Sequence, residues 1–218
     1  MGMGDTDIRR LIARRAAREV RSGMVVNLGI GIPSLVPDFL GTDVRVMFQA
    51  ENGILGMGPT PASDADPNLS NAAGYPVTVV PGASYFDSAV SFGMIRTGRV
   101  DLAILGALQV SAQGDLANWI VPGKRVPGVG GAMELAAGAR NLIAVMSHVE
   151  KDGAPKIVSS LTLPVTARSC VSKIITDMAV FRLDEHGLVL EELMDGCSEP
   201  DVRSKTSAAY RISESLII

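Results

Sequence analysis

Apolar residues along this chain alternate between two spacings, one typical of buried strands and one typical of helices. The predicted strands are the short apolar runs at residues 24–28, 44–50, 77–80, 102–105 and 142–146. The predicted helices are residues 5–22, 84–97 and 133–139. We expect Asp5 or Thr6 to cap the first helix and Gly23 to end it. The alternation predicts an α/β fold with a layered αβα arrangement around an open, largely parallel sheet.

Two segments between these elements are rich in glycine, proline and polar residues, and we expect loops at residues 56–76 and 114–131. Loops of this length are uncommon unless they serve a function. Shorter strands are predicted at residues 156–159, 174–176, 179–182 and 188–191, with helices at residues 166–171 and 199–206. No internal repeat separates the chain into parts, and its length favours a single domain over residues 1–218.

Composition excludes several classes of protein. With 47% hydrophobic and 20% charged residues, the sequence is typical of a globular protein and not of a disordered one. The net charge is −3 and no basic stripe is present, so we expect no nucleic-acid partner. No apolar run is long enough for a membrane span. An arginine-rich start hints at a transit peptide, but acidic residues interrupt it, and we expect a cytoplasmic protein.

The sequence motifs typical of metal sites, nucleotide-binding sites and catalytic triads are missing or incomplete. Cys170 and Cys197 show no CxxC spacing and the two histidines lie far apart, so we expect inert thiols and no metal site. A dinucleotide fingerprint starting at Gly29 and Gly31 needs a third glycine where Ser34 stands. Neither a P-loop nor a G-x-S-x-G nucleophile motif is present.

One acidic residue stands out by its position. Glu51 follows a predicted buried strand and precedes the turn signal Asn52-Gly53, which predicts that it emerges at the carboxyl edge of the sheet. The turns after Leu28 and Leu105 are expected at the same edge. A glutamate is ionised at neutral pH and can attack an activated acyl group without a partner base. Position alone favours a simpler interpretation, in which Glu51 caps the turn or pairs with an arginine.

A set of motifs in a fixed order changes this balance. They are residues 26–33 (VNLGIGIP), 51–56 (ENGILG), 81–86 (PGASYF), 115–119 (DLANW), 122–124 (PGK) and 128–133 (GVGGAM). Together they resemble the small (B) subunit of family I coenzyme A-transferases, of the 3-oxoacid, acetoacetate and succinyl-CoA type. The resemblance runs from about residue 8 to residue 206 and implies a CoA-transferase-like fold.

The resemblance implies a chemistry for these residues. Glu51 becomes the nucleophile that forms an acyl-glutamyl anhydride and then a glutamyl-CoA thioester, in a ping-pong transfer of CoA to a 3-oxo or short-chain acid. The CoA-binding positions fall on Asn27, Gly29 and Gly31. The residues that bind the reacting carbonyl through backbone N–H groups fall on Gly130, Gly131 and Ala132. Without the resemblance, an ordinary turn before the helix at residues 133–139 would explain the glycine run.

The same resemblance implies substrates and a partner. Coenzyme A is a substrate, no permanent cofactor is needed, and an A-type subunit completes a hetero-oligomer, which we expect to be A2B2. Asn52, Asn118 and Trp119 are assigned to the edge of the pocket. The sequence departs from the family at Ala50, where serine is usual. It also departs at Tyr75, near the place where some relatives carry a CoA-contacting lysine. These departures leave substrate preference and rate open.

Two alternatives remain open from the sequence. Water instead of an acid could capture the glutamyl intermediate, which would make the protein an acyl-CoA hydrolase. The chain could also be a non-catalytic binding or regulatory subunit with the same fold. The acid substrate stays open among acetoacetate, butyrate, succinate and oxoadipate.

Overall fold

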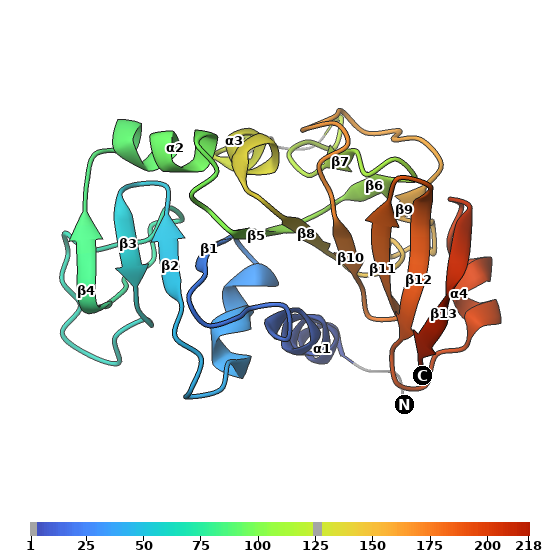
Figure 1. Cartoon of the computed structure of the whole chain (residues 1–218), viewed down its shortest axis with the longest axis horizontal. Helices are drawn as coiled ribbons and strands as arrows, with labels where there is room; N and C mark the ends of the chain where they lie inside the picture. The colour runs from blue at the N-terminus through green and yellow to red at the C-terminus, as the bar shows by residue number, and fades with distance from the viewer. Residues whose placement is uncertain (1–3, 124–127) are drawn as a thin grey trace.

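The computed structural model describes residues 4–123 and 128–218 of the chain, and its main feature is one large sheet (Figure 1). Its ten strands lie in the order β13-β12-β11-β10-β8-β5-β1-β2-β3-β4. They are β1 (Val25–Leu28), β2 (Met47–Ala50), β3 (Ile54–Met57), β4 (Val79–Tyr85), β5 (Leu102–Gly106), β8 (Leu142–Val145), β10 (Lys173–Ile175), β11 (Ala179–Asp184), β12 (Gly187–Leu193) and β13 (Tyr210–Ile217). A second sheet, in the order β7-β6-β9, comprises β6 (Gln109–Ser111), β7 (Leu116–Ala117) and β9 (Ile157–Val158).

Helices cover the large sheet on both faces. They are α1 (Asp5–Ala17), the 3₁₀ helix η1 (Pro33–Phe39), α2 (Ser88–Arg96), α3 (Ala132–Gly138) and α4 (Glu199–Ser204). In Figure 1, α1 lies below the central strands while α2 and α3 lie above them. Ile104 packs in the apolar cluster that contains α1, and its neighbour Leu105 packs in the cluster that contains residues of α2 and α3. Successive side chains of a buried strand therefore face opposite layers, and the predicted αβα arrangement is confirmed.

The centre of the sheet is parallel, β3 and β11 are antiparallel to both of their neighbours, and β13 at one end runs parallel to β12. Strands β2, β1, β5, β8 and β10 run in the same direction. Val26 of β1 pairs with both Phe48 of β2 and Leu102 of β5. Because parallel neighbours end at the same edge, the turns after Leu28, Ala50 and Leu105 lie together, as predicted.

Several predicted boundaries are wrong. Helix α1 starts at Asp5 with Gly4 as its cap, and it ends at Ala17 instead of near residue 22. The strand expected to stop at residue 80 continues as β4 through Pro81. Proline is tolerated there because β4 is an edge strand of the sheet. The following helix starts only at Ser88, and Asp87 caps it by accepting a 2.8 Å hydrogen bond from the Val90 N–H.

The predicted helix at residues 166–171 is also wrong, because that segment is irregular. The N–H groups of Cys170 and Val171 donate to the Gly114 carbonyl, which ties the segment to the smaller sheet. Strands β3, β6, β7 and β13 were not predicted, and β7 lies within the loop expected at residues 114–131. Lys124, part of one motif, lies outside the described residues.

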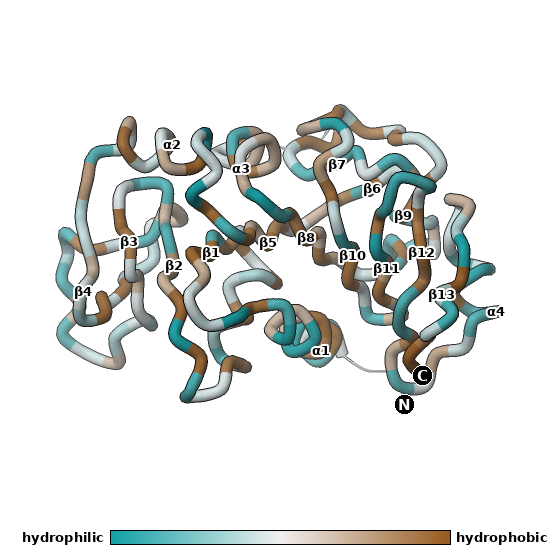
Figure 2. The backbone as a smooth tube through the Cα atoms, viewed as in Figure 1, coloured by the Kyte–Doolittle hydropathy of each residue, from teal (hydrophilic) through white to brown (hydrophobic). Residues whose placement is uncertain are grey.

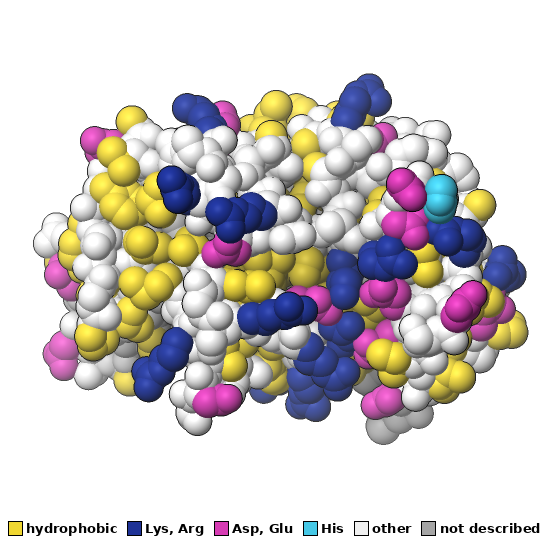
Figure 3. Space-filling view, in the orientation of Figure 1, with side chains coloured by type: hydrophobic (Ala, Val, Ile, Leu, Met, Phe, Trp, Pro, Cys, Tyr) yellow, Lys and Arg dark blue, Asp and Glu magenta, His cyan; other side chains and the backbone are white. Residues whose placement is uncertain are grey.

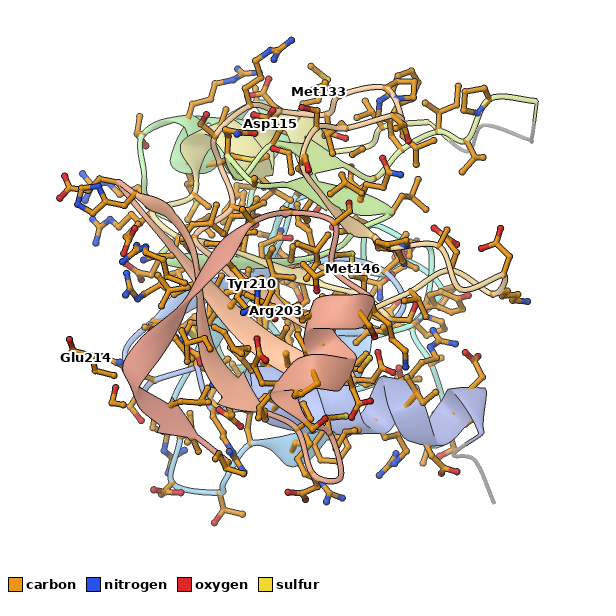
Figure 4. The ribbon with its side chains drawn as sticks, turned by 90° about the vertical axis from the view of Figure 1, so that its right-hand side faces the viewer. Asp115, Met133, Met146, Arg203, Tyr210 and Glu214 are labelled. Carbon is orange, nitrogen blue, oxygen red and sulfur yellow. The ribbon has the colours of Figure 1, made fainter. Side chains whose placement is uncertain are left out.

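The C-terminal strands carry α4 on their outer side. Ser198 and Asp201 form a capping box at the start of α4. The Arg203 guanidinium lies 4.7 Å from the centre of the Tyr210 ring, and Figure 4 shows the two residues close together while Glu214 points away. Tyr210 also packs edge-on against the buried Phe181 ring. These contacts fix α4 against β11 and β13.

The hydropathy of the chain follows these layers. Helix α1 carries both hydrophobic and hydrophilic residues around its turns (Figure 2). Lys and Arg side chains gather over α1 at the lower centre of Figure 3, while hydrophobic side chains gather over β2, β3 and β4. Among the helices in the described part of the chain, none combines the length and the apolar character that crossing a membrane requires.

Candidate active site

Glu51 is the first residue of a tight turn at the carboxyl end of β2. The turn joins β2 to β3 and is closed by the Gly53 N–H, which donates to the Ala50 carbonyl at 3.0 Å. Gly53 has φ +123°, and a Cβ atom there would lie 2.0 Å from the Phe86 carbonyl oxygen, so only glycine fits. Glu51 is half-buried at the edge of the sheet, where the sequence predicted it.

Asn27 on the neighbouring strand β1 reaches the Glu51 carboxylate. Asn27 pairs in register with Gln49 and is 1% exposed. Its Nδ2 donates to Glu51 Oε2 at 3.1 Å, to the Gln49 backbone oxygen at 3.1 Å and to Gln49 Oε1 at 2.7 Å. Its Oδ1 is buried and has no hydrogen-bond partner among the described residues. Such an orphaned acceptor is uncommon and requires an explanation.

Gly131 lies against the other side of the carboxylate. A Cβ atom built on Gly131 would lie 3.2 Å from Glu51 Oε1 and 3.3 Å from Glu51 Cδ. The residue has φ −82°, a conformation that any amino acid adopts, so the absence of a side chain matters here for the space beside Glu51 and not for backbone freedom. Two segments 80 positions apart in the sequence (131 − 51) are thus in contact at the carboxylate.

The neighbours of Gly131 in the sequence, Gly130 and Ala132, differ in their surroundings and hydrogen bonds. Gly130 has φ +54°, and apart from its chain neighbours no described residue has an atom within 4 Å of the place where its Cβ would be. The Ala132 N–H donates to the Val129 carbonyl at 3.2 Å at the start of α3. Of the three positions, only Gly131 is in contact with Glu51 among the described contacts.

Gly29 and Gly31 shape the loop that follows Asn27. The Gly29 N–H donates to the Ile104 carbonyl at 2.9 Å, which continues the pairing of β1 with β5. Gly31 has φ +93° and turns the chain into η1. A hollow of about 350 Å³ opens beside Gly31, and its walls include Arg9, Ile30 and Tyr75.

The residues predicted at the pocket edge make their hydrogen bonds elsewhere. The Asn52 side chain is exposed and donates to the Ser70 carbonyl at 2.8 Å, so it connects the turn to the loop at residues 58–76. The Asn118 side chain accepts from Thr166 Oγ1 at 2.8 Å, beside the smaller sheet. Trp119 is half-buried. None of these described hydrogen bonds reaches Glu51.

Two buried polar residues near Glu51 were missed by the sequence analysis. Gln49 Nε2 donates to Ser91 Oγ at 2.7 Å, and Ser91 Oγ donates to the Ala50 carbonyl at 3.3 Å. Both side chains are almost fully buried. The available signal was a glutamine inside an apolar strand, since a buried amide needs hydrogen-bond partners nearby.

The surroundings of Glu51 leave its carboxylate available. Within residues 4–123 and 128–218 no ion pair involves Glu51, so the predicted alternative of an arginine partner is not observed there. Its described hydrogen bond runs to Asn27 and not to the turn that follows it. A half-buried carboxylate beside an amide donor and a bare backbone segment is a suitable arrangement for attack on a carbonyl carbon.

The other reactive side chains are less suited to this role. Burial lowers the pKa of His148 to about 4, and its ring nitrogens lie 2.9 Å from Thr176 Oγ1 and from Thr206 Oγ1. Burial raises the pKa of Cys170 to about 11, so its thiol is protonated at neutral pH. Burial also raises the pKa of Cys197. These directions agree with the prediction of inert thiols.

Comparison with known proteins identifies the family. The coenzyme A transferase family matches residues 9–198. The chain is 57% identical to a probable coenzyme A transferase subunit beta of Bacillus subtilis, over 97% of this chain and 98% of that protein. It is 47% identical to the acetate CoA-transferase subunit beta of Escherichia coli, over 96% of both chains.

A solved structure supports the same fold. The acyl-CoA transferase apoenzyme of Escherichia coli O157:H7 superposes with a TM-score of 0.80 at 24% identity, covering 99% of this chain and 44% of that longer chain. The likeness at this identity concerns the fold, and the family follows from the sequence matches. The chain therefore belongs to the coenzyme A transferase family, whose members are transferases.

Proposed function

We propose that this chain is the B subunit of a CoA-transferase in which Glu51 is the covalent nucleophile. The Glu51 carboxylate attacks the carbonyl of the acyl-CoA donor, forms an acyl-glutamyl anhydride and releases the CoA thiolate. The thiolate attacks the glutamyl carbonyl, which gives a glutamyl-CoA thioester and frees the donor acid. An acceptor carboxylate repeats these steps in reverse and leaves as the new CoA ester. The observation that carries the proposal is the placement of the Glu51 carboxylate between Asn27 and Gly131.

Asn27 has two functions in this scheme. Its Nδ2 orients the Glu51 carboxylate, and its unpartnered Oδ1 accepts a hydrogen bond from an N–H group of bound CoA. Such an N–H would satisfy an otherwise costly buried acceptor. The hollow beside Gly31 gives part of the CoA chain a place along the loop from Gly29 to η1. CoA is a substrate here, and the scheme needs no permanent cofactor.

The backbone before α3 stabilises the oxygen that becomes negative during attack. The N–H groups of Gly130 and Gly131 have no acceptor among the described residues, so they are available as donors. Ala132 is the weaker candidate, because its N–H already donates to Val129. Asn52, Asn118 and Trp119 stay outside this scheme, since their described contacts give them no part in it.

The proposed acceptor is a short-chain or 3-oxo carboxylic acid, in line with the acetate named for the Escherichia coli relative. The departure at Ala50 has a local explanation. The Ala50 methyl group is buried in a small apolar cluster with Ile54 and Val77, where a hydroxyl would need a hydrogen-bond partner of its own.

We further propose that an A-type subunit completes the enzyme as an A2B2 assembly, with this chain as one domain. The relatives are named as beta subunits, and the structural match covers less than half of a longer acyl-CoA transferase chain. Exposed apolar side chains occur on segments that adjoin the site, at Ile30, Tyr85 and Met133. Figure 4 shows Met133 at the upper surface. A partner would cover such groups.

Intact mass spectrometry of the A–B complex tests the mechanism. After mixing with an acyl-CoA, this chain should gain the mass of CoA less one water, on the peptide that contains Glu51. Borohydride should remove the adduct by reducing the thioester. An unmodified chain in a complex that turns over would contradict the covalent scheme.

The same preparation distinguishes the two alternatives. Transfer to an added acid without net release of thiol identifies a transferase, whereas thiol release without an acceptor identifies a hydrolase. A folded complex that binds acyl-CoA but neither forms the adduct nor turns over would identify a non-catalytic subunit.

A further inference from the structure

A continuous chain of hydrogen bonds connects helix α2 to the Glu51 carboxylate. Ser91 on α2 accepts from Gln49 Nε2 at 2.7 Å, Gln49 Oε1 accepts from Asn27 Nδ2 at 2.7 Å, and Asn27 Nδ2 donates to Glu51 Oε2 at 3.1 Å. Ser91, Gln49 and Asn27 are each at most 1% exposed. In such surroundings water cannot readily replace a lost partner, so each bond affects the next.

The donor and acceptor roles along this series of hydrogen bonds are determined by Ser91, the member farthest from Glu51. The single hydroxyl proton of Ser91 is donated to the Ala50 carbonyl, so its oxygen accepts from the NH2 group of Gln49. The Gln49 oxygen is then turned toward Asn27, which must present its own NH2 group. A reversed Asn27 amide would point its oxygen at the Glu51 carboxylate and at two Gln49 oxygens, and like dipoles would repel.

The Asn27 NH2 group has two protons but three acceptors. They are Glu51 Oε2, Gln49 Oε1 and the Gln49 backbone oxygen. Gln49 therefore competes with Glu51 for the same donor. When Glu51 is converted to an anhydride or a thioester and loses its charge, its oxygen becomes a weaker acceptor. The Gln49 oxygens then retain both protons, and the buried amide is not left unpaired.

We propose that Gln49 and Ser91 are positioning residues for the transfer reaction, which act through Asn27 to hold the Glu51 carboxylate in the orientation for attack. This proposal rests on the function proposed above. Neither residue touches the reacting atoms, because each acts on the direction of the Asn27 amide. Small errors in the placement of a reacting group cost rate, since attack depends on distance and alignment.

Three variants of the A–B complex test this proposal. Ser91→Ala removes the acceptor of Gln49, and Gln49→Met keeps the length of the side chain without its hydrogen-bonding groups. Each should slow formation of the CoA adduct at saturating acyl-CoA by roughly 10- to 100-fold. The matched control is Ser172→Ala, which also removes a hydroxyl that donates to a backbone carbonyl, that of Leu142, at the amino edge of the strands. The control should form the adduct at the wild-type rate.

A conservative replacement of Ser91 distinguishes the effect of its hydroxyl from an effect of side-chain packing. Ser91→Thr keeps the hydroxyl and should recover most of the adduct rate that Ser91→Ala loses. If Ser91→Thr does not fold because of its extra methyl group, Gln49→Met decides the question. Wild-type adduct rates in both Ser91→Ala and Gln49→Met would overturn the proposal.

Crystal structures of the same complexes separate failure of this proposal from failure of the proposed function. In Ser91→Ala and Gln49→Met the Glu51 carboxylate should leave Asn27 or take several orientations, while Ser172→Ala should keep the 3.1 Å contact. An unchanged contact in both variants would overturn the positioning function. A wild-type complex without any adduct would overturn the proposed function, and the crystal structures would still decide whether Gln49 and Ser91 position Glu51.

Discussion

The surface between α1 and the sheet and the carboxyl edge around Glu51 differ in how completely their polar groups are paired. Between α1 and the sheet, Arg15 bonds to Glu192 at 2.7 Å and to Glu19 at 2.7 Å, and Glu19 also pairs with Lys173 at 3.0 Å. At the carboxyl edge, Glu51 makes one described hydrogen bond. The paired surface supports the fold, and the open edge leaves groups free to meet a substrate.

The pKa of Glu19 shows this pairing between α1 and the sheet. Burial by itself would raise the pKa of Glu19, but hydrogen bonds and charges from Arg15 and Lys173 outweigh it and lower that pKa. A carboxyl group whose pKa is lower in the folded state stabilises the fold above its unfolded pKa. That contribution is lost as the pH falls through the folded pKa. At neutral pH these ion pairs therefore stabilise the packing of α1 on the sheet, whereas no described ion pair involves Glu51.

The largest expected effect is at the open edge. Glu51→Gln removes the charged nucleophile while keeping the size of the side chain, so kcat should fall by roughly 10⁴-fold or more. The urea unfolding midpoint and assembly with the A-type partner should change little, because Glu51 takes part in no described ion pair. Steady-state transfer assays and denaturation on the same preparations measure both. A fully active Glu51→Gln complex would disprove the covalent scheme.

The paired surface between α1 and the sheet should respond in the opposite way. Glu192→Ala leaves the buried Arg15 guanidinium without one of its two partners and should lower the free energy of unfolding by about 3 kcal/mol. Activity per folded molecule should stay at the wild-type level. In the double variant Arg15→Met/Glu192→Leu, apolar packing replaces the pair and much of the stability should return. Urea unfolding at pH 7 measures each change, and a loss of activity without a loss of stability would contradict the comparison.

The sequence was sufficient for the neighbourhood of Glu51 but not for all of its contacts. Adjacent parallel strands that end at one edge bring Asn27 beside Glu51, and both strands are short apolar runs that periodicity detects. The turn at Gly53 was predicted from Asn-Gly chemistry. Gly131 was placed near the reacting carbonyl only by the family resemblance, since its contact with Glu51 depends on how α3 packs on the sheet. The edge strand β4 was misread at Pro81 because an edge position is a property of the assembled sheet.

The carboxyl edge also has a closed part, around His148 at the ends of β8 and β10. Burial is the main reason that its pKa is lowered to about 4; the Asp177 charge raises it and the Lys205 charge lowers it. In the unfolded chain His148 takes up a proton near pH 6.5. In the folded protein it stays neutral down to about pH 4. Acidification across this window favours the unfolded state and should cost about 3 kcal/mol of stability.

A His148→Gln variant isolates this titration. Its amide can still bond to Thr176 and Thr206 but does not titrate, so the fall in stability between pH 6.5 and pH 4.5 should largely disappear. The measured quantity is the slope of unfolding free energy against pH, which is independent of any constant loss caused by the substitution. An unchanged slope would mean that His148 takes up its proton equally in the folded and unfolded states.

The smallest expected effect compares two glycines. Gly131→Ala adds a methyl group 3.2 Å from Glu51 Oε1 in a backbone conformation that alanine adopts freely, so the fold should tolerate it and the carboxylate should move. We expect kcat to fall by roughly 10- to 100-fold with little change in stability. Gly93→Ala is the control: Gly93 lies inside α2, and beyond the helix's own backbone no described atom lies within 4 Å of the new methyl group. This variant should raise stability by about 0.5–1 kcal/mol at wild-type activity. Equal activity in the two variants would show that the contact between Gly131 and Glu51 does not control the placement of the carboxylate.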